Sequence, residues 1–334
     1  MMILKRGKIF LSTIALTIGL GLQACSPTEK SIEPDKEPTE TISDAQAKAD
    51  ETLNLDHVNP LRPTRFTVEI YGEIAEQSAS GKPQIILLPG LASSPDVWDA
   101  TREQLEATHE VHVLHVNGFA GSDVGQNSEP GSLFEIAKQV SAYASALEKP
   151  SIIGHSMGGL VALMVASQEE APVSKVMSVD VLPFFSVLIN PMATEKNMKP
   201  AAVEARDKML AQSDDEFADS QKAAMKRLTL SDEDAAIAAQ WSISSDRAAV
   251  ANIMYDVMLT DLRKDVSKIS VPTTVVYAFD QATGFPKNAV AGAYQINYAA
   301  LQNVDLRMIE NARHYLMMDQ PEAFAAEVSR FVAE

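Results

Sequence analysis

The 334-residue sequence has a single cysteine, Cys25, which excludes an intramolecular disulfide bond. It also has fewer basic than acidic residues, with 28 lysines and arginines against 45 aspartates and glutamates, for a net charge of −17. Such a chain repels a phosphate backbone, so nucleic-acid binding is disfavoured. We find no internal repeat. The chain does have 46% apolar residues, which is ample material for a buried core.

The N-terminus has the composition of a secretory signal. Three cationic residues lie among the first eight, and the apolar run of residues 9–22 is short for a membrane span. The run ends in Leu-Gln-Ala-Cys25, which resembles the lipobox of bacterial lipoproteins. This resemblance implies that residues 1–24 are removed. It also implies that Cys25 is diacylated and anchors the protein to a membrane of the bacterial cell envelope, facing the periplasm. The alternatives are an uncleaved anchor or an ordinary signal peptide.

Composition divides the rest of the chain into three parts. Residues 25–60 are rich in acidic residues, serine, threonine and proline, and cannot bury enough surface to fold, so they predict a flexible linker. Residues 61–182 and 263–334 alternate short β-branched runs with helical stretches, which predicts an α/β core with a mostly parallel sheet. Residues 183–262 show helical spacing without a clear strand and predict a helical cap.

The order of expected elements can be given by residue number. We expect strands at 66–71, 84–88, 111–116, 151–154, 173–179, 271–278 and 304–309, and core helices at 97–107, 132–147, 157–168, 287–301 and 321–332. Ser132 and Glu135 form a capping-box pattern, which predicts Ser132 as the N-cap of its helix.

The G-x-S-x-G motif around Ser156 lies between a buried strand and a helix. A sharp turn there lifts the serine hydroxyl out of the sheet edge and leaves no space for side chains two residues before and after. Gly154 and Gly158 fill these two positions. The pattern predicts Ser156 as a nucleophile.

A serine needs a neighbouring base to take its proton. Of the six histidines, His314 suits this role because it lies in a loop after a late strand, at the sheet edge where Ser156 is expected. The others are His57 in the linker, His109, His112 and His115 near one strand, and His155 beside the serine. His112 points away from His109 and His115, which makes this strand a poor metal site, and we expect no metal.

Two aspartates can orient the imidazole of His314. Asp280 follows the strand Val-Val-Tyr-Ala and gives the chain order Ser, Asp, His, so we favour it. Asp180 ends the strand after the nucleophile helix, and its carboxylate could reach the same histidine. For the oxyanion, we expect the backbone N–H groups of Met157, directly after the nucleophile, and Leu91, in the loop after residues 84–88.

Five sequence segments, in their order along the chain, carry a resemblance to a known superfamily: LLPGLASSPDVW, VNGFAGSD, GHSMGG, SVPTTVVYAFD and ARHYLMMDQPEAF. Together they resemble the cap-bearing, serine esterase-like branch of the α/β-hydrolase superfamily, over about residues 66–334. The resemblance implies a central sheet flanked by helices, with the cap inserted after the strand that follows the nucleophile helix. Ser156 stands where dehalogenases and epoxide hydrolases of this fold have aspartate, which argues against those two chemistries.

These observations predict a serine hydrolase that cleaves a carboxylic ester of a small to medium, partly apolar molecule, without a cofactor. Two alternatives stay open. One is an acyltransferase that uses the same residues, and the other is a non-catalytic envelope binding protein on a hydrolase scaffold. The sequence indicates neither the physiological ester nor the oligomeric state.

Overall fold

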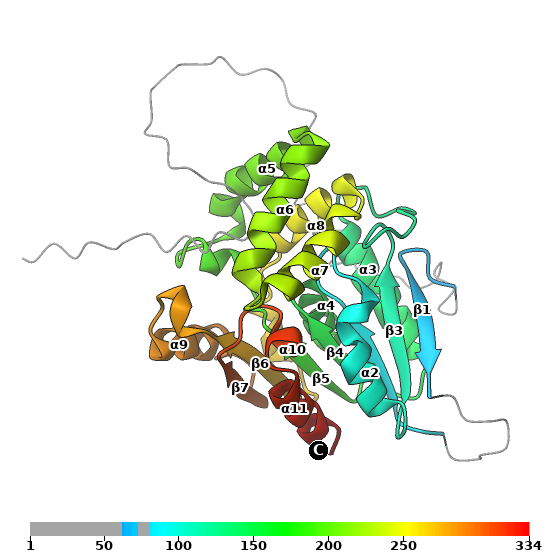
Figure 1. Ribbon diagram of the computed structural model, residues 1–334. Helices are drawn as coiled ribbons and strands as arrows, with labels where there is room; N and C mark the ends of the chain where they lie inside the picture. Colours follow the sequence, from blue (N-terminus) through cyan, green and yellow to red (C-terminus); the bar gives the residue numbers. More distant parts are fainter. Residues whose placement is uncertain (1–61, 73–80, 334) are drawn as a thin grey trace, which may run out of the picture.

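The computed structural model describes residues 62–72 and 81–333. Seven strands form one sheet in the order β1-β3-β2-β4-β5-β6-β7 (Figure 1). Only β1 runs antiparallel, to β3, and all other neighbours are parallel. The strands are β1 (Phe66–Tyr71), β2 (Gln84–Leu88), β3 (Glu110–Val116), β4 (Ser151–His155), β5 (Lys175–Val179), β6 (Thr273–Phe279) and β7 (Val304–Glu310). The mostly parallel sheet predicted from the sequence is confirmed.

Helices cover both faces of the sheet. One face carries α3 (Ser132–Ser145), α4 (Met157–Ala166) and α9 (Lys287–Asn297), and the other carries α2 (Asp99–Leu105) and α11 (Pro321–Ala333). Short turns of helix complete the core: α10 (Leu316–Asp319), η1 (Pro95–Trp98), η2 (Phe185–Leu188), η3 (Asp265–Lys268) and η4 (Gln281–Thr283).

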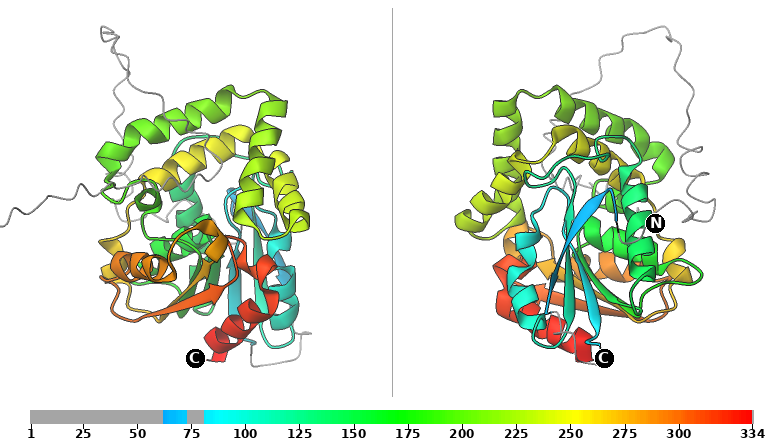
Figure 2. Two further views of the ribbon diagram at one scale, coloured as in Figure 1. Left: turned by 60° about the vertical axis from the view of Figure 1, so that its left-hand side comes forward. Right: turned by 90° about the vertical axis from the view of Figure 1, so that its right-hand side faces the viewer.

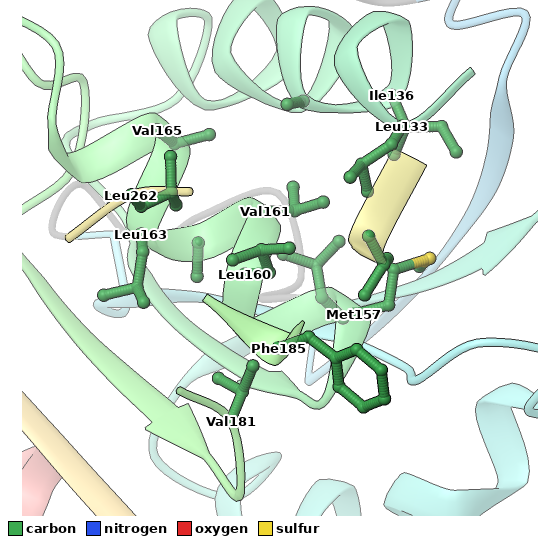
Figure 3. Close-up of a cluster of buried hydrophobic side chains, with 14 of the residues drawn as sticks. Leu133, Ile136, Met157, Leu160, Val161, Leu163, Val165, Val181, Phe185 and Leu262 are labelled. Atoms are coloured by element: carbon green, nitrogen blue, oxygen red, sulfur yellow. The ribbon is translucent and has the colours of Figure 1, made fainter. Parts of the chain in front are cut away.

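This layering explains the apolar runs of the strands. In β2, Ile86 and Leu88 pack on the α3–α4 side, whereas Ile85 and Leu87 pack on the opposite side. Alternate side chains of a strand point to opposite faces, so a strand buried on both sides is apolar throughout. On the first face, α4 packs against α3, with Val161 near Leu133 and Ile136 (Figure 3). The core therefore holds the β4–α4 junction rigidly.

Four helices lie between β5 and β6: α5 (Glu195–Ala211), α6 (Asp214–Leu228), α7 (Asp232–Ile243) and α8 (Arg247–Leu259). Each begins with a side chain that accepts a backbone N–H, namely Thr194, Ser213, Ser231 and Asp246. They form a layer over one end of the sheet (Figure 2). Asp246 N donates to Gly118 O, 2.7 Å away, in the loop after β3, so this layer covers the carboxyl edge. We call these four helices the cap.

One expected detail of α3 is wrong. Gly131, not Ser132, is the N-cap residue, and its φ of 83° lies in the left-handed region that glycine favours. The Ser132 hydroxyl instead donates to Glu129 O, 2.6 Å away. The N–H groups of Gly131 and Leu133 donate to the Asp256 carboxylate, at 3.3 and 3.2 Å. Asp256 belongs to α8, so a residue of the four-helix cap supplies acceptors to the N-terminal end of a core helix.

The expected signal peptide, Cys25 and the linker lie outside the described residues. Within residues 62–72 and 81–333, no helix combines the length and apolarity needed to cross a membrane.

Candidate active site

Ser156 lies at a strained turn between β4 and α4. Its φ of 52° and ψ of −118° are a conformation that non-glycine residues rarely adopt. The turn is held by the Ser156 N–H, which donates to Val179 O of the neighbouring strand β5 at 2.8 Å. Because the surrounding core fixes this geometry, the hydroxyl is presented at the carboxyl edge of the sheet rather than packed inside it.

The two motif glycines are required by close backbone contacts. A Cβ atom on Gly154 would lie 2.2 Å from the carbonyl oxygen of Gly158. A Cβ atom on Gly158 would lie 2.4 Å from the carbonyl oxygen of Leu88, at the end of β2. Backbone atoms cannot move aside cheaply, so both positions exclude any side chain. The turn is therefore packed directly against the start of the loop that contains Leu91.

The structure brings that loop beside the nucleophile. A Cβ atom on Gly90 would meet Ser156 Cβ at 3.3 Å, and Leu91 is the next residue. Met157 is the first residue of α4, so its N–H has no acceptor within the helix. The N-terminal end of α4, which carries partial positive charge, thus begins directly at Ser156, beside the loop that contains Leu91.

His314 meets Asp180, not Asp280. His314 Nδ1 lies 2.8 Å from Asp180 Oδ2, a separation typical of a hydrogen bond to a carboxylate. The other carboxylate oxygen, Oδ1, accepts from the Ala278 N–H and from the Tyr294 hydroxyl, each at 3.0 Å. Asp180 thus has three donors, and His314 Nε2 is left for another partner.

The expected contact between Asp280 and His314 is therefore wrong. Asp280 caps the short turn η4 by accepting the Ala282 N–H at 2.9 Å, and its other oxygen accepts Arg313 Nε at 2.8 Å. Burial favours the neutral carboxyl, but the hydrogen bonds from Ala282 and Arg313 outweigh it and lower the pKa of Asp280. This carboxylate therefore holds the residue before His314 rather than His314 itself.

His155 links the nucleophile turn to the base loop. Its Nε2 lies 2.9 Å from the carbonyl oxygen of His314, and the two imidazole rings are 4.6 Å apart between centroids. Burial, with the nearby His314, pushes the pKa of His155 well below its usual range, so the ring is neutral. A neutral ring that donates through Nε2 fixes the backbone of His314 next to Ser156.

The hydrogen bond expected between the nucleophile and its base is not formed. Among the hydrogen bonds of the described part of the chain, none joins Ser156 Oγ to His314. Catalytic hydrogen bonds are often long in ligand-free enzymes and tighten when substrate binds. The arrangement is thus an imidazole that is oriented by a carboxylate and tied, through His155, to the strained turn that carries Ser156.

Sequence reasoning missed Tyr294 and Arg313. The Tyr294 phenol reaches Asp180 from α9, stacked on Tyr277 with 4.0 Å between ring centroids. Nothing in the local sequence of α9 signals this role, because it depends on how α9 packs. Arg313 does carry a signal, since it directly precedes His314 and must share its loop.

Residues 85–327 match the profile of the Alpha/beta hydrolase family. The chain belongs to this family. It is similar to the pimeloyl-[acyl-carrier protein] methyl ester esterase of Vibrio atlanticus (strain LGP32), with 33% identity over 110 residues, or 33% of the chain. That match spans only 41% of the relative's length. The esterase of the same name from Nitrosospira multiformis is 22% identical over 265 residues, covering 76% of the chain and 96% of the relative.

Solved structures agree on the fold of this α/β hydrolase. The enol-lactonase from Burkholderia xenovorans LB400 superposes with a TM-score of 0.64 at 18% identity, over 80% of the chain and 96% of the lactonase. MenH from S. aureus superposes with a TM-score of 0.62 at 16% identity, over 81% and 98% of the two chains. At such low identities the likeness establishes the fold alone.

The polar groups of the site do not assemble into a metal centre. Across the residues with described positions, no cluster of three or more histidine, cysteine or acidic side chains could hold a metal ion. In this α/β hydrolase, the side chains described above bring a hydroxyl, an imidazole and a carboxylate to one edge of the sheet.

Proposed function

We propose that this α/β hydrolase is a serine esterase that cleaves a small to medium, partly apolar carboxylic ester through an acyl-enzyme. The observation that carries the proposal is the His314–Asp180 hydrogen bond of 2.8 Å, formed beside the strained turn of Ser156. A carboxylate that fixes Nδ1 leaves Nε2 of the imidazole to act as a base. Asp180 replaces Asp280 as the orienting acid.

The reaction has two steps. His314 Nε2 removes the Ser156 proton as Oγ attacks the ester carbonyl carbon, and the N–H groups of Leu91 and Met157 stabilise the oxyanion. The imidazolium then protonates the departing alcohol. In the second step, water gives a proton to His314 as its oxygen attacks the acyl carbon. The bond to Ser156 Oγ then breaks, the imidazolium returns the proton to Oγ, and the acid is released.

Methyl esters of medium-length acyl chains are the substrates to test first, since the relatives from Vibrio and Nitrosospira are named as methyl ester esterases. Met157, the residue after Ser156, belongs with Val181 and Phe185 to one buried apolar cluster (Figure 3).

The experiment is a series of methyl and p-nitrophenyl esters of graded chain length, run on the wild type and on Ser156→Ala. The wild type should hydrolyse them and be labelled at Ser156 by a fluorophosphonate. Ser156→Ala should lose roughly 10⁶-fold in kcat, as other serine hydrolases do. Equal turnover by both proteins would refute the proposal.

We also propose that Cys25 is the lipidated N-terminus of the mature protein and that the domain faces the periplasm. The support is the cationic start, the short apolar run and the Leu-Gln-Ala-Cys25 sequence. Wild-type protein expressed in a Gram-negative host should partition into Triton X-114, and Cys25→Ser should not. Unchanged partitioning would contradict lipidation.

A further inference from the structure

Both neighbours of His314 contact the cap. Arg313 Nη1 donates to the carbonyl oxygens of Lys226 and Thr229 at 3.1 and 2.9 Å, and the Tyr315 N–H donates to Leu228 O at 3.1 Å. These carbonyls lie at the C-terminal end of α6, where they lack partners within the helix and carry partial negative charge. A guanidinium at this end is electrostatically favourable. We call residues 226–230, which end α6 and begin the turn toward α7, the cap corner.

Two carboxylates fix Arg313 in this position. Asp280 accepts its Nε at 2.8 Å, and Asp319 accepts its backbone N–H at 2.7 Å. The other oxygen of Asp319 accepts the Leu230 N–H of the cap corner at 2.7 Å. Because the guanidinium is planar, with five donors in a fixed arrangement, its contacts to Asp280 and to the cap corner constrain each other.

The same loop is tied to the rest of the active site. The Tyr315 hydroxyl lies 3.1 Å from Ser93 Oγ, in the loop that contains Leu91. The His314 carbonyl faces His155, and His314 Nδ1 faces Asp180. A shift of the cap corner that moves residues 313–315 must therefore also disturb the contacts of His314.

We propose that Arg313 is a positioning residue that couples the seating of the cap corner to the placement of His314 opposite Ser156. When the corner is seated over the site, the Arg313 contacts hold the base in its working position. When the corner lifts, the loop loses that support, so the base is fully placed only under a closed cap. This inference rests on the proposed serine hydrolase function.

The test compares Arg313→Gln with Arg247→Gln. Arg247 is a matched control because its guanidinium also binds a helix end, Gln212 O after α5, and pairs with Asp214, but all within the cap. Arg313→Gln should lower kcat and the fluorophosphonate labelling rate by about 10- to 100-fold with KM within about twofold, since small misplacements of a catalytic group are that damaging. Arg247→Gln should keep both rates within about twofold of wild type.

A change from the cap side separates coupling from simple support of the loop. The Thr229 hydroxyl has two acceptors within reach, Met225 O at 3.0 Å and Ser231 O at 3.3 Å, so Thr229→Val loosens the corner without removing any Arg313 group. It should lower kcat about fivefold. Added to Arg313→Gln, it should lower kcat by no more than about twofold further, since coupled residues are not additive.

Several results would overturn the inference. Multiplicative effects in the double variant, or equal kcat for Arg313→Gln and Arg247→Gln, would mean that the corner and the base are independent. If Arg313→Gln does not fold, Asp280→Asn serves instead, with an expected loss of kcat of about three- to tenfold, because Arg313 keeps its contacts to the cap corner. Wild-type protein that resists fluorophosphonate labelling would instead refute the proposed function.

Discussion

Asp180 occupies an unusual backbone position for its role. Its φ of 49° lies in the left-handed region, which aspartate tolerates better than most residues, and its N–H donates to Val276 O at 2.8 Å. This bend at the end of β5 aims the carboxylate across β6 toward His314. The carboxylate then has three hydrogen-bond donors, so it is held in place before any substrate arrives.

Replacing each aspartate by asparagine should distinguish the orienting acid from its neighbour. Asp180→Asn removes the acceptor charge beside His314 Nδ1 and favours the wrong tautomer, so kcat/KM should fall by roughly 10³- to 10⁴-fold. Asp280→Asn changes the support of Arg313 and the cap of η4 but no contact of His314, so its loss should stay below about tenfold. Ester hydrolysis at pH 7 measures both. A larger loss for Asp280→Asn would return the role to Asp280.

The Tyr294 phenol should contribute to the same carboxylate. Tyr294→Phe keeps the ring stacked on Tyr277 but removes one donor to Asp180 Oδ1, so kcat should fall about three- to tenfold with KM unchanged. Tyr298→Phe is the matched control, because it also loses a buried hydrogen bond, to Val181 O at 2.8 Å, without touching Asp180. Equal steady-state kinetics for the two variants would count against this role.

These residues differ in how far the sequence alone can predict them. The Ser156 turn was predictable because its glycine requirement arises from contacts within a few residues of chain and one neighbouring strand. His314 was predictable as the base because the positions of the other five histidines do not suit that role. The acid was not predictable, because Asp180 and Asp280 follow adjacent parallel strands and emerge at the same edge. Tertiary contacts distinguish the two: Asp280 binds Arg313, whereas the bend at Asp180 brings its carboxylate to His314.

At the scale of elements, α3 shows how a tertiary contact replaces a local one. The Ser132 pattern predicts an N-cap formed by residues of α3 itself. Instead, Asp256 of α8 accepts the N–H groups at the start of α3. Asn252, one turn earlier in α8, donates to Ser128 O at 2.6 Å. Two residues of α8 therefore anchor the cap to the start of α3 and the loop before it. No sequence pattern within α3 could have revealed a partner more than 120 residues later in the chain.

This anchor should make stability depend on pH. Burial raises the pKa of Asp256 to about 7, although hydrogen bonds from Leu133 and Gly131 oppose the shift. The folded protein thus keeps this proton up to about pH 7, whereas the unfolded chain releases it near about pH 4. The contribution of Asp256 to stability is therefore greatest below about pH 4 and declines as pH rises to about 7.

Asp256→Asn tests that dependence, since the amide stays neutral and can still accept one N–H. At pH 5 its melting temperature should be equal to that of the wild type or lower. Between pH 5 and pH 8, the difference (variant minus wild type) should increase by several degrees. Thermal melts at both pH values measure the difference. A constant difference between the two proteins would mean that Asp256 does not titrate in this window.

At the scale of the whole molecule, the sheet and its helices were predictable because each follows from local patterning. Strands such as Ile85–Leu88 are apolar throughout because both faces are buried. The cap was predictable only as a helical region. Its arrangement depends on contacts such as Arg313 with the cap corner and Asp256 with α3, which join segments far apart in sequence. Its helices therefore take their positions from the core.

The net charge of −17 should influence which esters are used efficiently. An anionic ester, such as a dicarboxylic acid monomethyl ester, is repelled by this field, whereas a neutral dimethyl ester of the same length is not. Because salt screens the repulsion, kcat/KM for the anionic ester should rise roughly two- to fivefold between 10 and 150 mM NaCl. The neutral ester should change little and serves as the control. A fall in kcat/KM for the anionic ester would instead reveal local positive charge at the entrance that overrides the overall field.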